Sequence, residues 1–280
     1  MGISFQQVGY QYPTLTTKKW AIKDINVTID STQEFVAVVG HTGSGKSTLV
    51  QHMNALLLAT TGSVNVFGHP AAKGKPLTPI RKKVGMVFQF PEYQLFEETV
   101  EKDIMFGPLN FGQSKEKAKE LAHQMISIVG LDEELLFRSP FSLSGGQMRR
   151  VAIAGILAME PNILILDEPT VGLDPAGQKS MMDLFRTLTE DYGKTIIIVT
   201  HDMNVVAEYT SRVLVMNQGS MAFDGSPEDL FSNQELLDEC NLDIPSVSRI
   251  VKDVSTAFGY SMEETPLSIN EAVAFIKEKT

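Results

Sequence analysis

The stretch "FVAVVGHTGSGKSTLV", residues 35–50, decides the fold. It opens with a continuously apolar run, residues 35–39, which is typical of a strand covered on both faces of a parallel sheet. Residues 40–47 then match the pattern G-x-x-x-x-G-K-[ST], and the residues after them favour a helix. A buried strand, a glycine-rich loop and a helix in this order predict a phosphate-binding loop, because inward-facing N–H groups and a helix N-terminus both attract anions.

This loop predicts a site for a nucleoside triphosphate. Lys46 would reach the β- and γ-phosphates, and the Ser47 hydroxyl would bind Mg²⁺. A glycine-rich turn without a ligand is the alternative, and the flanking strand and helix argue against it. The predicted nucleotide site comprises the loop and the start of the helix: Gly40, His41, Thr42, Gly43, Ser44, Gly45, Lys46, Ser47 and Thr48.

Two more apolar runs, "ILIL" (163–166) and "TIIIV" (195–199), are each followed directly by polar residues. In open α/β sheets, chemistry gathers at the carboxyl ends of the strands, so these residues are expected beside the loop. Asp167 is placed to hold Mg²⁺ through water, and Glu168, on the alternate side, is free to orient or deprotonate the attacking water. His201 could contact the γ-phosphate as a neutral imidazole. The alternatives are a capping role for Glu168 and a structural role for His201.

Composition excludes several classes of protein. The chain has 280 residues and a formal net charge of -10, which argues against DNA or anionic lipid as the main ligand. It contains no apolar run of about 18 residues and no basic leader, so we expect it to fold in the cytoplasm and to reach a membrane only through a protein partner. Its single cysteine, Cys240, is expected to be an ordinary buried or semi-buried thiol.

The rest of the chain shows weaker patterns. The N-terminal part alternates in hydropathy and predicts antiparallel strands, while residues 114–129 predict a helix with Ser114 as its N-cap. From about residue 227 we expect short amphipathic helices around an irregular middle. The side chains of four histidines have no strand-end setting and are expected to be solvated or in loops: His41, His52, His69 and His123.

A second glycine-containing segment, "LSGGQMRRVAIAGILAMEP", begins at Leu143. Its Ser144, Gly145 and Gly146 would open a helix running through Ala158 and form a second anion site. The order of the phosphate loop, "LSGGQ", "ILILDE", "VGLDP" (171–175) and His201 resembles the ATP-binding cassette (ABC) ATPases over about residues 3–230.

This resemblance implies an α/β fold, a P-loop NTPase cassette with a RecA-like core, an antiparallel β subdomain and a helical subdomain. The ABC ATPase domain would span residues 1–230, with the helical subdomain at approximately 90–158. Residues 231–280 would form a C-terminal helical extension that helps two subunits pair.

The resemblance also implies roles for single residues. Two cassettes pair head to tail in the family, so Ser144, Gly145, Gly146 and Gln147 would act on a partner's ATP and Asp174 would lie between the subunits. Val171 replaces a small residue, for which only a packing change is expected. Tyr12 matches the aromatic residue that stacks on adenine, with Tyr10 as the rival. Gln89 matches the glutamine that touches Mg²⁺ and the attacking water.

The acidic stretch "FQFPEYQLFEETVEKDIMFGP", residues 88–108, resembles the ATPases of energy-coupling factor (ECF) transporters, most closely the second, A-prime, ATPase. Those transporters import vitamins and transition-metal ions. In the family, the residues after the glutamine form a groove that receives an arginine-bearing coupling helix of a membrane subunit. Five carboxylates would suit such arginines, with a solvated acidic face as the alternative: Glu92, Glu97, Glu98, Glu101 and Asp103.

The resemblance therefore implies a transport ATPase that uses ATP and Mg²⁺, peripheral on the cytoplasmic face of the cell membrane. Its catalytic residues would be Glu168, His201 and Gln89, and Mg²⁺ would be held by Ser47, Gln89 and Asp167. The implied partners are a second ABC ATPase, which would make a heterodimer, a transmembrane scaffold and substrate-binding membrane subunits, but no nucleic acid.

Three alternative functions compete with this interpretation. A soluble ABC ATPase acting on DNA or ribosomes is disfavoured by the single cassette, the compact segment 89–143 and the acidic charge. A binding-only subunit is disfavoured because every hydrolytic residue is present. A dedicated cobalt or nickel importer, in which the ATPase pairs with a copy of itself, stays open.

Overall fold

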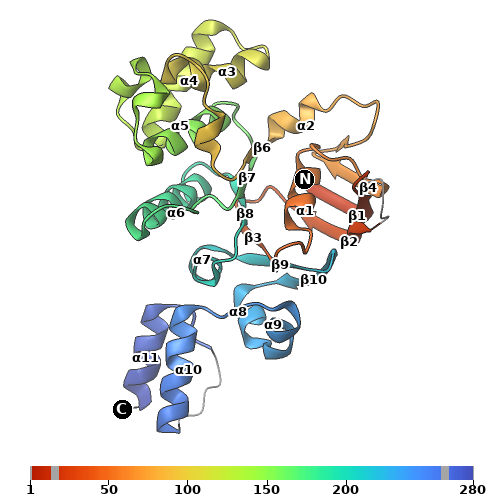
Figure 1. Cartoon of the computed structure of the whole chain (residues 1–280), viewed down its shortest axis with the longest axis vertical. Coiled ribbons are helices and arrows are strands. Elements are labelled where there is room, and N and C mark those ends of the chain that lie inside the picture. The colour runs from red at the N-terminus through yellow and green to blue at the C-terminus, as the bar shows by residue number, and fades with distance from the viewer. Residues whose placement is uncertain (1, 14–18, 260–264, 280) are drawn as a thin grey trace.

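The computed structural model describes residues 2–13, 19–259 and 265–279. A six-stranded sheet in the order β10-β9-β3-β8-β7-β6 lies at its centre (Figure 1). All neighbours in this sheet pair in parallel except β10, which is antiparallel to β9. The strands are β3 (Phe35–Val39), β6 (Val84–Val87), β7 (Ile163–Asp167), β8 (Thr195–Val199), β9 (Arg212–Asn217) and β10 (Ser220–Gly225). The three predicted apolar strands are thus β3, β8 and β7, side by side, and their carboxyl ends share one edge.

The central sheet separates two hydrophobic cores. Successive residues of β3 alternate between them: Phe35 belongs to the first core and Val36 to the second. Phe185 of α6 (Pro175–Glu190) packs in the first core, and Leu49 of α1 (Lys46–Met53) packs in the second. Both faces of the sheet are therefore covered, which explains why these strands have continuous rather than alternating apolar residues.

A second, antiparallel sheet has the order β2-β1-β4-β5. Its strands are β1 (Ile3–Gln11), β2 (Trp20–Ile29), β4 (Thr61–Val66) and β5 (His69–Pro70). Ile22 and Ile25 of β2 are fully buried in the second core, whereas Lys23 and Asp24 between them are exposed. The alternating N-terminal pattern is therefore confirmed as a half-buried antiparallel sheet.

A helical subdomain lies beyond β6, at the top of Figure 1. It contains α3 (Val100–Asn110), α4 (Lys115–Ile128) and α5 (Gly145–Leu157), with the 3-10 turns η1 (Pro91–Gln94), η2 (Glu133–Phe137) and η3 (Pro140–Ser142). The predicted N-cap is confirmed, because the Ser114 hydroxyl accepts the N–H of Lys117 at 3.2 Å.

The C-terminal part contains α8 (Pro227–Ser232), α9 (Gln234–Cys240), α10 (Ser246–Phe258) and α11 (Ile269–Lys279). The expected irregular middle is wrong, because it contains α10, which packs beside α11 (Figure 1). Pro245 precedes α10, where a missing N–H costs nothing, and Gly259 ends it in the left-handed conformation, with φ 71°. These two residues mark helix ends rather than a loop. Cys240 is fully buried, as predicted.

The remaining helices are α2 (Thr78–Lys83) and α7 (Met203–Tyr209). In the described part of the chain, no helix has the length and apolar character that a membrane span requires.

Candidate nucleotide and catalytic site

The glycine-rich loop joins β3 to α1 in a conformation that needs its glycines. Gly40 and Gly45 have φ values of 141° and 109°, in the region that favours glycine. A side chain at Gly40 would collide with the carbonyl oxygen of Met216. Lys46 Nζ donates to the carbonyl oxygens of Gly40, at 2.7 Å, and His41, at 3.1 Å. The loop therefore folds around the ammonium group of its own lysine.

Tyr12 stands at one side of this loop. A cavity of about 240 Å³ separates them, lined by Tyr12, Ala21, Gly43, Gly45, Lys46, Ser47 and Thr48. The Tyr12 hydroxyl lies 3.1 Å from Thr48 Oγ1, and its side chain is 45% exposed. Tyr10 meets the Tyr12 ring edge-on at 4.9 Å and packs against the second core. Of the two rival tyrosines, Tyr12 is the one that lines the cavity.

Glu168 and His201 meet on the other side of the loop, at the ends of β7 and β8. Glu168 Oε1 lies 2.8 Å from His201 Nδ1. Both line a cavity of about 420 Å³ that also touches Gly40, His41, Thr42 and Lys46. The structure therefore brings the predicted base and the predicted histidine together beside the phosphate loop.

Asp167, Glu168 and Lys46 lie close enough to influence one another's charge. Burial and the nearby Glu168 raise the pKa of Asp167, while a hydrogen bond from Ser47 and the charge of Lys46 oppose that rise. Burial lowers the pKa of Lys46, and Glu168 and Asp167 act in the opposite direction. Ser47 thus donates a hydrogen bond to Asp167 next to the lysine, and both residues have side-chain oxygen atoms that could bind a metal ion.

Gln89 follows β6 and is exposed. Val87 pairs with Leu166, directly before Asp167, so Gln89 lies at the same edge of the sheet as the carboxylates. Its side chain lines neither of the two cavities described above. Its assignment as a catalytic and Mg²⁺-binding residue stays a prediction.

The "LSGGQ" residues lie in the helical subdomain. The Ser144 hydroxyl accepts the N–H of Gln147 at 3.3 Å, and Gln147 Oε1 accepts the N–H of Ser144 at 3.0 Å, which forms a capping box. A side chain added at Gly145 or Gly146 would meet no atom within 4 Å. Asp174 caps α6 by accepting the N–H of Gly177 at 2.8 Å. None of these residues lines the two cavities, so their roles toward a partner's nucleotide stay predictions.

Most carboxylates of the acidic stretch already have partners within the chain. Fewer than five of them are therefore available to arginines of a coupling helix. Glu92 binds Arg149 and is only 12% exposed. Glu98 pairs with Lys102. Two more are also engaged: Glu101 lies at 3.4 Å from Lys119 and 3.3 Å from His123, and Asp103 accepts the backbone N–H groups of Phe96 and Glu97. The stretch is therefore no row of five free carboxylates.

Two of the four histidine expectations are wrong. His52 is fully buried on α1, where it donates from Nδ1 to the Thr48 carbonyl oxygen at 2.7 Å and burial lowers its pKa. His123 lies on α4, partly buried between Glu101 and Glu133. His69 is exposed on β5, and His41 lies in the phosphate loop.

The C-terminal extension contributes residues to this site that were not predicted from the sequence. Asn241, Leu242 and Asp243 line the cavity that contains Glu168 and His201. The N–H of Ser246 donates to Asn204 Oδ1 at 2.8 Å, close in sequence to His201. No motif marks these residues, because only the three-dimensional packing of the extension brings them to the site.

Comparisons with known proteins agree with this geometry. A protein-family model described as "ABC transporter" matches residues 22–171, more than half of the chain. The energy-coupling factor transporter ATP-binding protein EcfA2 of Enterococcus faecalis is 51% identical over 275 residues, which cover 97% of this chain and 94% of that protein. EcfA2 of Bacillus anthracis is 50% identical over the same coverage.

Solved structures show the same fold. The cbiO1 protein of Clostridium perfringens, described as part of the ABC transporter complex cbiONQ, superposes with a TM-score of 0.74 at 34% identity, covering 89% of this chain and 98% of that one. The ATP-binding cassette MJ0796, a dimer bound to ADP and Pi, superposes with a TM-score of 0.71 at 31% identity, covering 80% of this chain and 98% of that one. The predicted fold class is confirmed.

Proposed function

This chain belongs to the ABC transporter family, among the ATP-binding proteins of energy-coupling factor transporters, and from that membership we propose that it hydrolyses ATP to drive uptake of vitamins or other micronutrients through membrane partners. The pairing of Glu168 with His201 beside the phosphate loop carries the proposal. A carboxylate and an imidazole in contact at that place are suited to orient a water molecule toward the terminal phosphate.

ATP would lie across the loop. The adenine would stack on Tyr12, and the phosphates would bind the N–H groups of the loop and the ammonium group of Lys46. Mg²⁺ would be held by Ser47, Asp167 and Gln89 together with phosphate oxygens. Within the described residues, no group of three or more His, Cys, Asp or Glu side chains is placed to hold a metal. That fits Mg²⁺, which usually takes one or two carboxylates plus substrate phosphates.

Hydrolysis would then rest on positioning and charge. Lys46 and Mg²⁺ would neutralise charge that develops on the transferred phosphoryl group. Glu168 would accept the proton of the attacking water, and His201 would fix the position of that water and of Glu168. Lys46, Glu168 and His201 all line the larger cavity, and Lys46 also lines the cavity beside Tyr12.

A second ATPase would complete the site. Gly145 and Gly146 face open space at the N-terminus of α5, where backbone N–H groups can bind another subunit's γ-phosphate. Asp174, at the exposed start of α6, would lie between the two subunits. The dimeric state of MJ0796 supports this arrangement, and the partner we propose is a related but different ATPase.

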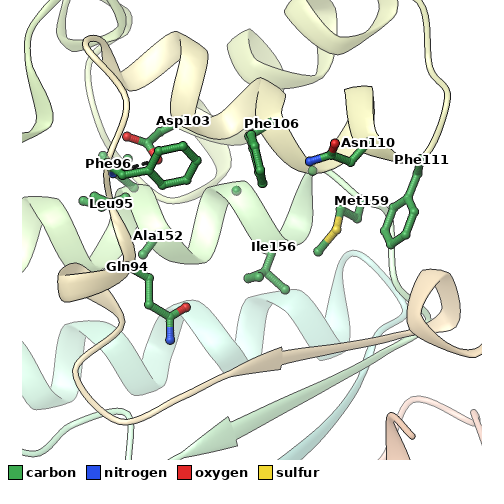
Figure 2. A pocket seen from close by; sticks show the side chains of 13 residues that line it. Gln94, Leu95, Phe96, Asp103, Phe106, Asn110, Phe111, Ala152, Ile156 and Met159 are labelled. Atoms are coloured by element: carbon green, nitrogen blue, oxygen red, sulfur yellow. Dashed lines mark hydrogen bonds between the residues drawn. The ribbon is translucent and has the colours of Figure 1, made fainter. Parts of the chain in front are cut away.

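The membrane subunit would dock in a groove next to the residues that follow Gln89. Figure 2 shows this cavity of about 430 Å³, between the segment before α3, α3 itself and α5. Its apolar lining includes Phe96, Phe106 and Ile156. An amphipathic helix that lays apolar side chains into such a groove buries them from water.

Asp103 gives the groove a charge. It lines the cavity, burial raises its pKa, and in the described structure it bonds two backbone N–H groups but no cation. An arginine on the incoming helix would supply the missing positive charge. Asp103 is thus our choice for the contact with a coupling helix, and the chain would sit peripherally on the cytoplasmic face of the membrane.

The test is to tag the full-length chain in its native host, solubilise the membranes gently and identify what co-purifies. We expect a multi-span scaffold, a second cassette ATPase and small substrate-binding membrane proteins. Asp103→Asn should lose the scaffold and keep the second ATPase. Asp132→Asn should keep both, because Asp132 is an exposed residue of the same subdomain whose side chain makes no capping hydrogen bond to η2. Purification without any membrane protein would contradict the transport function.

A dedicated cobalt or nickel importer is the second candidate, supported by the likeness to cbiO1. In that case one metal-binding membrane partner and no second ATPase would co-purify. The identity to the EcfA2 proteins, at 51% against 34% for cbiO1, favours the first candidate.

A further inference from the structure

Arg149 makes contacts that none of the functions above uses. It lies on α5 and is only 4% exposed. Its Nε and Nη2 atoms donate to the two carboxylate oxygens of Glu92, at 3.0 and 2.7 Å. Its Nη1 atom donates to the carbonyl oxygens of Pro169, at 3.0 Å, and Val171, at 2.8 Å. One buried side chain therefore ties together three segments that are distant in sequence.

Each of the three segments belongs to a different functional region: the groove, the loop after Glu168 and the helix that begins at the "LSGGQ" motif. Glu92 lies on η1, next to Gln94 and Leu95, which line the groove. Pro169 directly follows Glu168, the predicted base. The third segment is α5, which begins at the "LSGGQ" motif. Arg149 is thus the shared contact between the groove, the catalytic loop and the helix that carries the signature motif.

The loop after Glu168 is held near its two ends by other bonds: the N–H of Glu168 donates to the Val199 carbonyl oxygen at 3.0 Å, and Gln178 Nε2 donates to the Leu173 carbonyl oxygen at 3.1 Å. Residues 168–174 lie between β7 and α6, and the bond from the N–H of Val171 to the Glu168 carbonyl oxygen is long, at 3.4 Å. The loop also lies next to the segment after Gln89. A Cβ atom added at Gly172, which has φ 81°, would lie 3.8 Å from the Phe90 ring. Arg149 and Phe90 therefore connect the middle of the loop to α5 and to the segment after Gln89.

The chemistry of the contact makes it stiff. A guanidinium group presents its donors in a rigid, planar fork, so the four hydrogen bonds of Arg149 restrict the relative positions of their acceptors. Although burial acts to raise it, the bonds and charge of Arg149 hold the pKa of Glu92 below its usual range. A shift of η1 that broke the pair would leave two buried charges unpaired, so η1 and the loop should move together.

We propose that Arg149 is a positioning residue for ATP hydrolysis: it couples the groove, through Glu92, to the loop after Glu168. A helix that docks in the groove displaces η1, Arg149 follows Glu92, and the carbonyl groups of Pro169 and Val171 follow Arg149. The direction of this signal rests on the proposed docking of a membrane partner. The link between η1 and the loop does not, and it can be tested in the chain alone.

The first test measures backbone amide hydrogen exchange in the full-length chain. Glu92→Gln keeps the shape of the side chain and removes its charge. We expect exchange at residues 170–174 to rise about tenfold, the factor that corresponds to loss of one hydrogen bond to a charged group. ATP affinity should stay within about twofold, because Glu92 lines neither nucleotide cavity. Arg149→Lys, which keeps the charge but not the planar fork, should have the same local effect.

Asp224→Asn is the matched control. Asp224 accepts two bonds from Arg212, at 2.7 and 2.8 Å, in a pair between β9 and β10. It should leave exchange at residues 170–174 unchanged. Unchanged exchange in Glu92→Gln would overturn the proposed link. A uniform rise over the whole chain would also overturn it, because Arg149 would then only hold the fold together.

The second test uses the complex with its membrane partner and compares ATP turnover with and without that partner. Glu92→Gln should lose most of the increase that the partner causes, while Asp224→Asn should keep it. If Glu92→Gln raises exchange locally but responds fully to the partner, the link between η1 and the loop is supported, and its role in passing the docking signal to ATP turnover is refuted. Because the exchange test needs no partner, a failure of groove docking would not be mistaken for a failure of the link.

Discussion

Replacing Tyr12 tests an exposed part of the nucleotide site. Its side chain is 45% exposed and lines the cavity beside Lys46 and Thr48, so an adenine ring could cover a large part of it. Stacking of a base on an aromatic side chain contributes about 1–3 kcal/mol, judged by alanine substitution. Tyr12→Ala should therefore raise the dissociation constant of ATP by about 5- to 150-fold.

Two further substitutions distinguish the contribution of the Tyr12 ring from that of its hydroxyl group and from that of the neighbouring Tyr10. Tyr12→Phe loses only the contact with Thr48 Oγ1, at 3.1 Å, and should bind ATP within about threefold of the original chain. Tyr10→Ala removes the edge-on ring that supports Tyr12, a contact of about 0.5–1.5 kcal/mol. It should mainly lower the free energy of unfolding and weaken ATP binding less than Tyr12→Ala does.

Isothermal titration calorimetry with three ligands gives the readout. ATP and GTP should both lose affinity for Tyr12→Ala, because stacking tolerates either base. Tripolyphosphate, which has no base, should bind Tyr12→Ala and the original chain equally. Two results would refute the reasoning: an ATP affinity within twofold for Tyr12→Ala, or a larger loss for Tyr10→Ala than for Tyr12→Ala.

Three other changes have clear expected outcomes. Glu168→Gln cannot accept a proton, so ATP turnover should fall about 10²- to 10⁴-fold while ATP binding persists; near-normal release of phosphate at steady state would contradict this role. Lys46→Ala removes the ammonium group at the centre of the loop and should weaken ATP binding itself, which equal affinities of the two forms would disprove. Burial raises the pKa of the Cys240 thiol and so lowers its thiolate fraction at pH 8. A thiol-specific disulfide reagent should attack it slowly in the folded chain and rapidly after denaturation, and reaction at the rate of free glutathione would contradict that burial.

Local patterns predicted the strands and the central part of the site. The apolar runs at residues 35–39 and 195–199 coincide with β3 and β8, because a strand buried on both faces has no alternation to obscure its ends. Glu168 and His201 could be placed together from the sequence because both directly follow parallel strands, whose carboxyl ends share one edge. For these two residues the sequence was enough to predict that they lie together, because the pairing of the two strands alone brings them to the same edge of the sheet.

Features that depend on distant contacts could not be predicted. The pairing of Glu92 with Arg149 could not be predicted, because the two residues lie 57 positions apart and nothing local points from one to the other. His52 has the polarity of a surface residue, yet α1 turns it toward the second core. Asn241 reaches the site only through the fold of the C-terminal extension. The irregular middle expected in the C-terminal part contains α10, whose two ends lie at Pro245 and Gly259, and proline and glycine are as typical of loops as of helix ends.

The division of each central strand between the two cores has a consequence for unfolding. Phe35, Ala37 and Val39 pack on one side of the sheet, while Val36 and Val38 pack on the other, and β7 and β8 alternate in the same way. Neither core can lose its packing without disturbing strands that the other core also needs. Heat or denaturant should therefore melt the two together, in one cooperative step. No described residue of α10 or α11 belongs to either core, so this pair of helices can open earlier, and protease should cut it first.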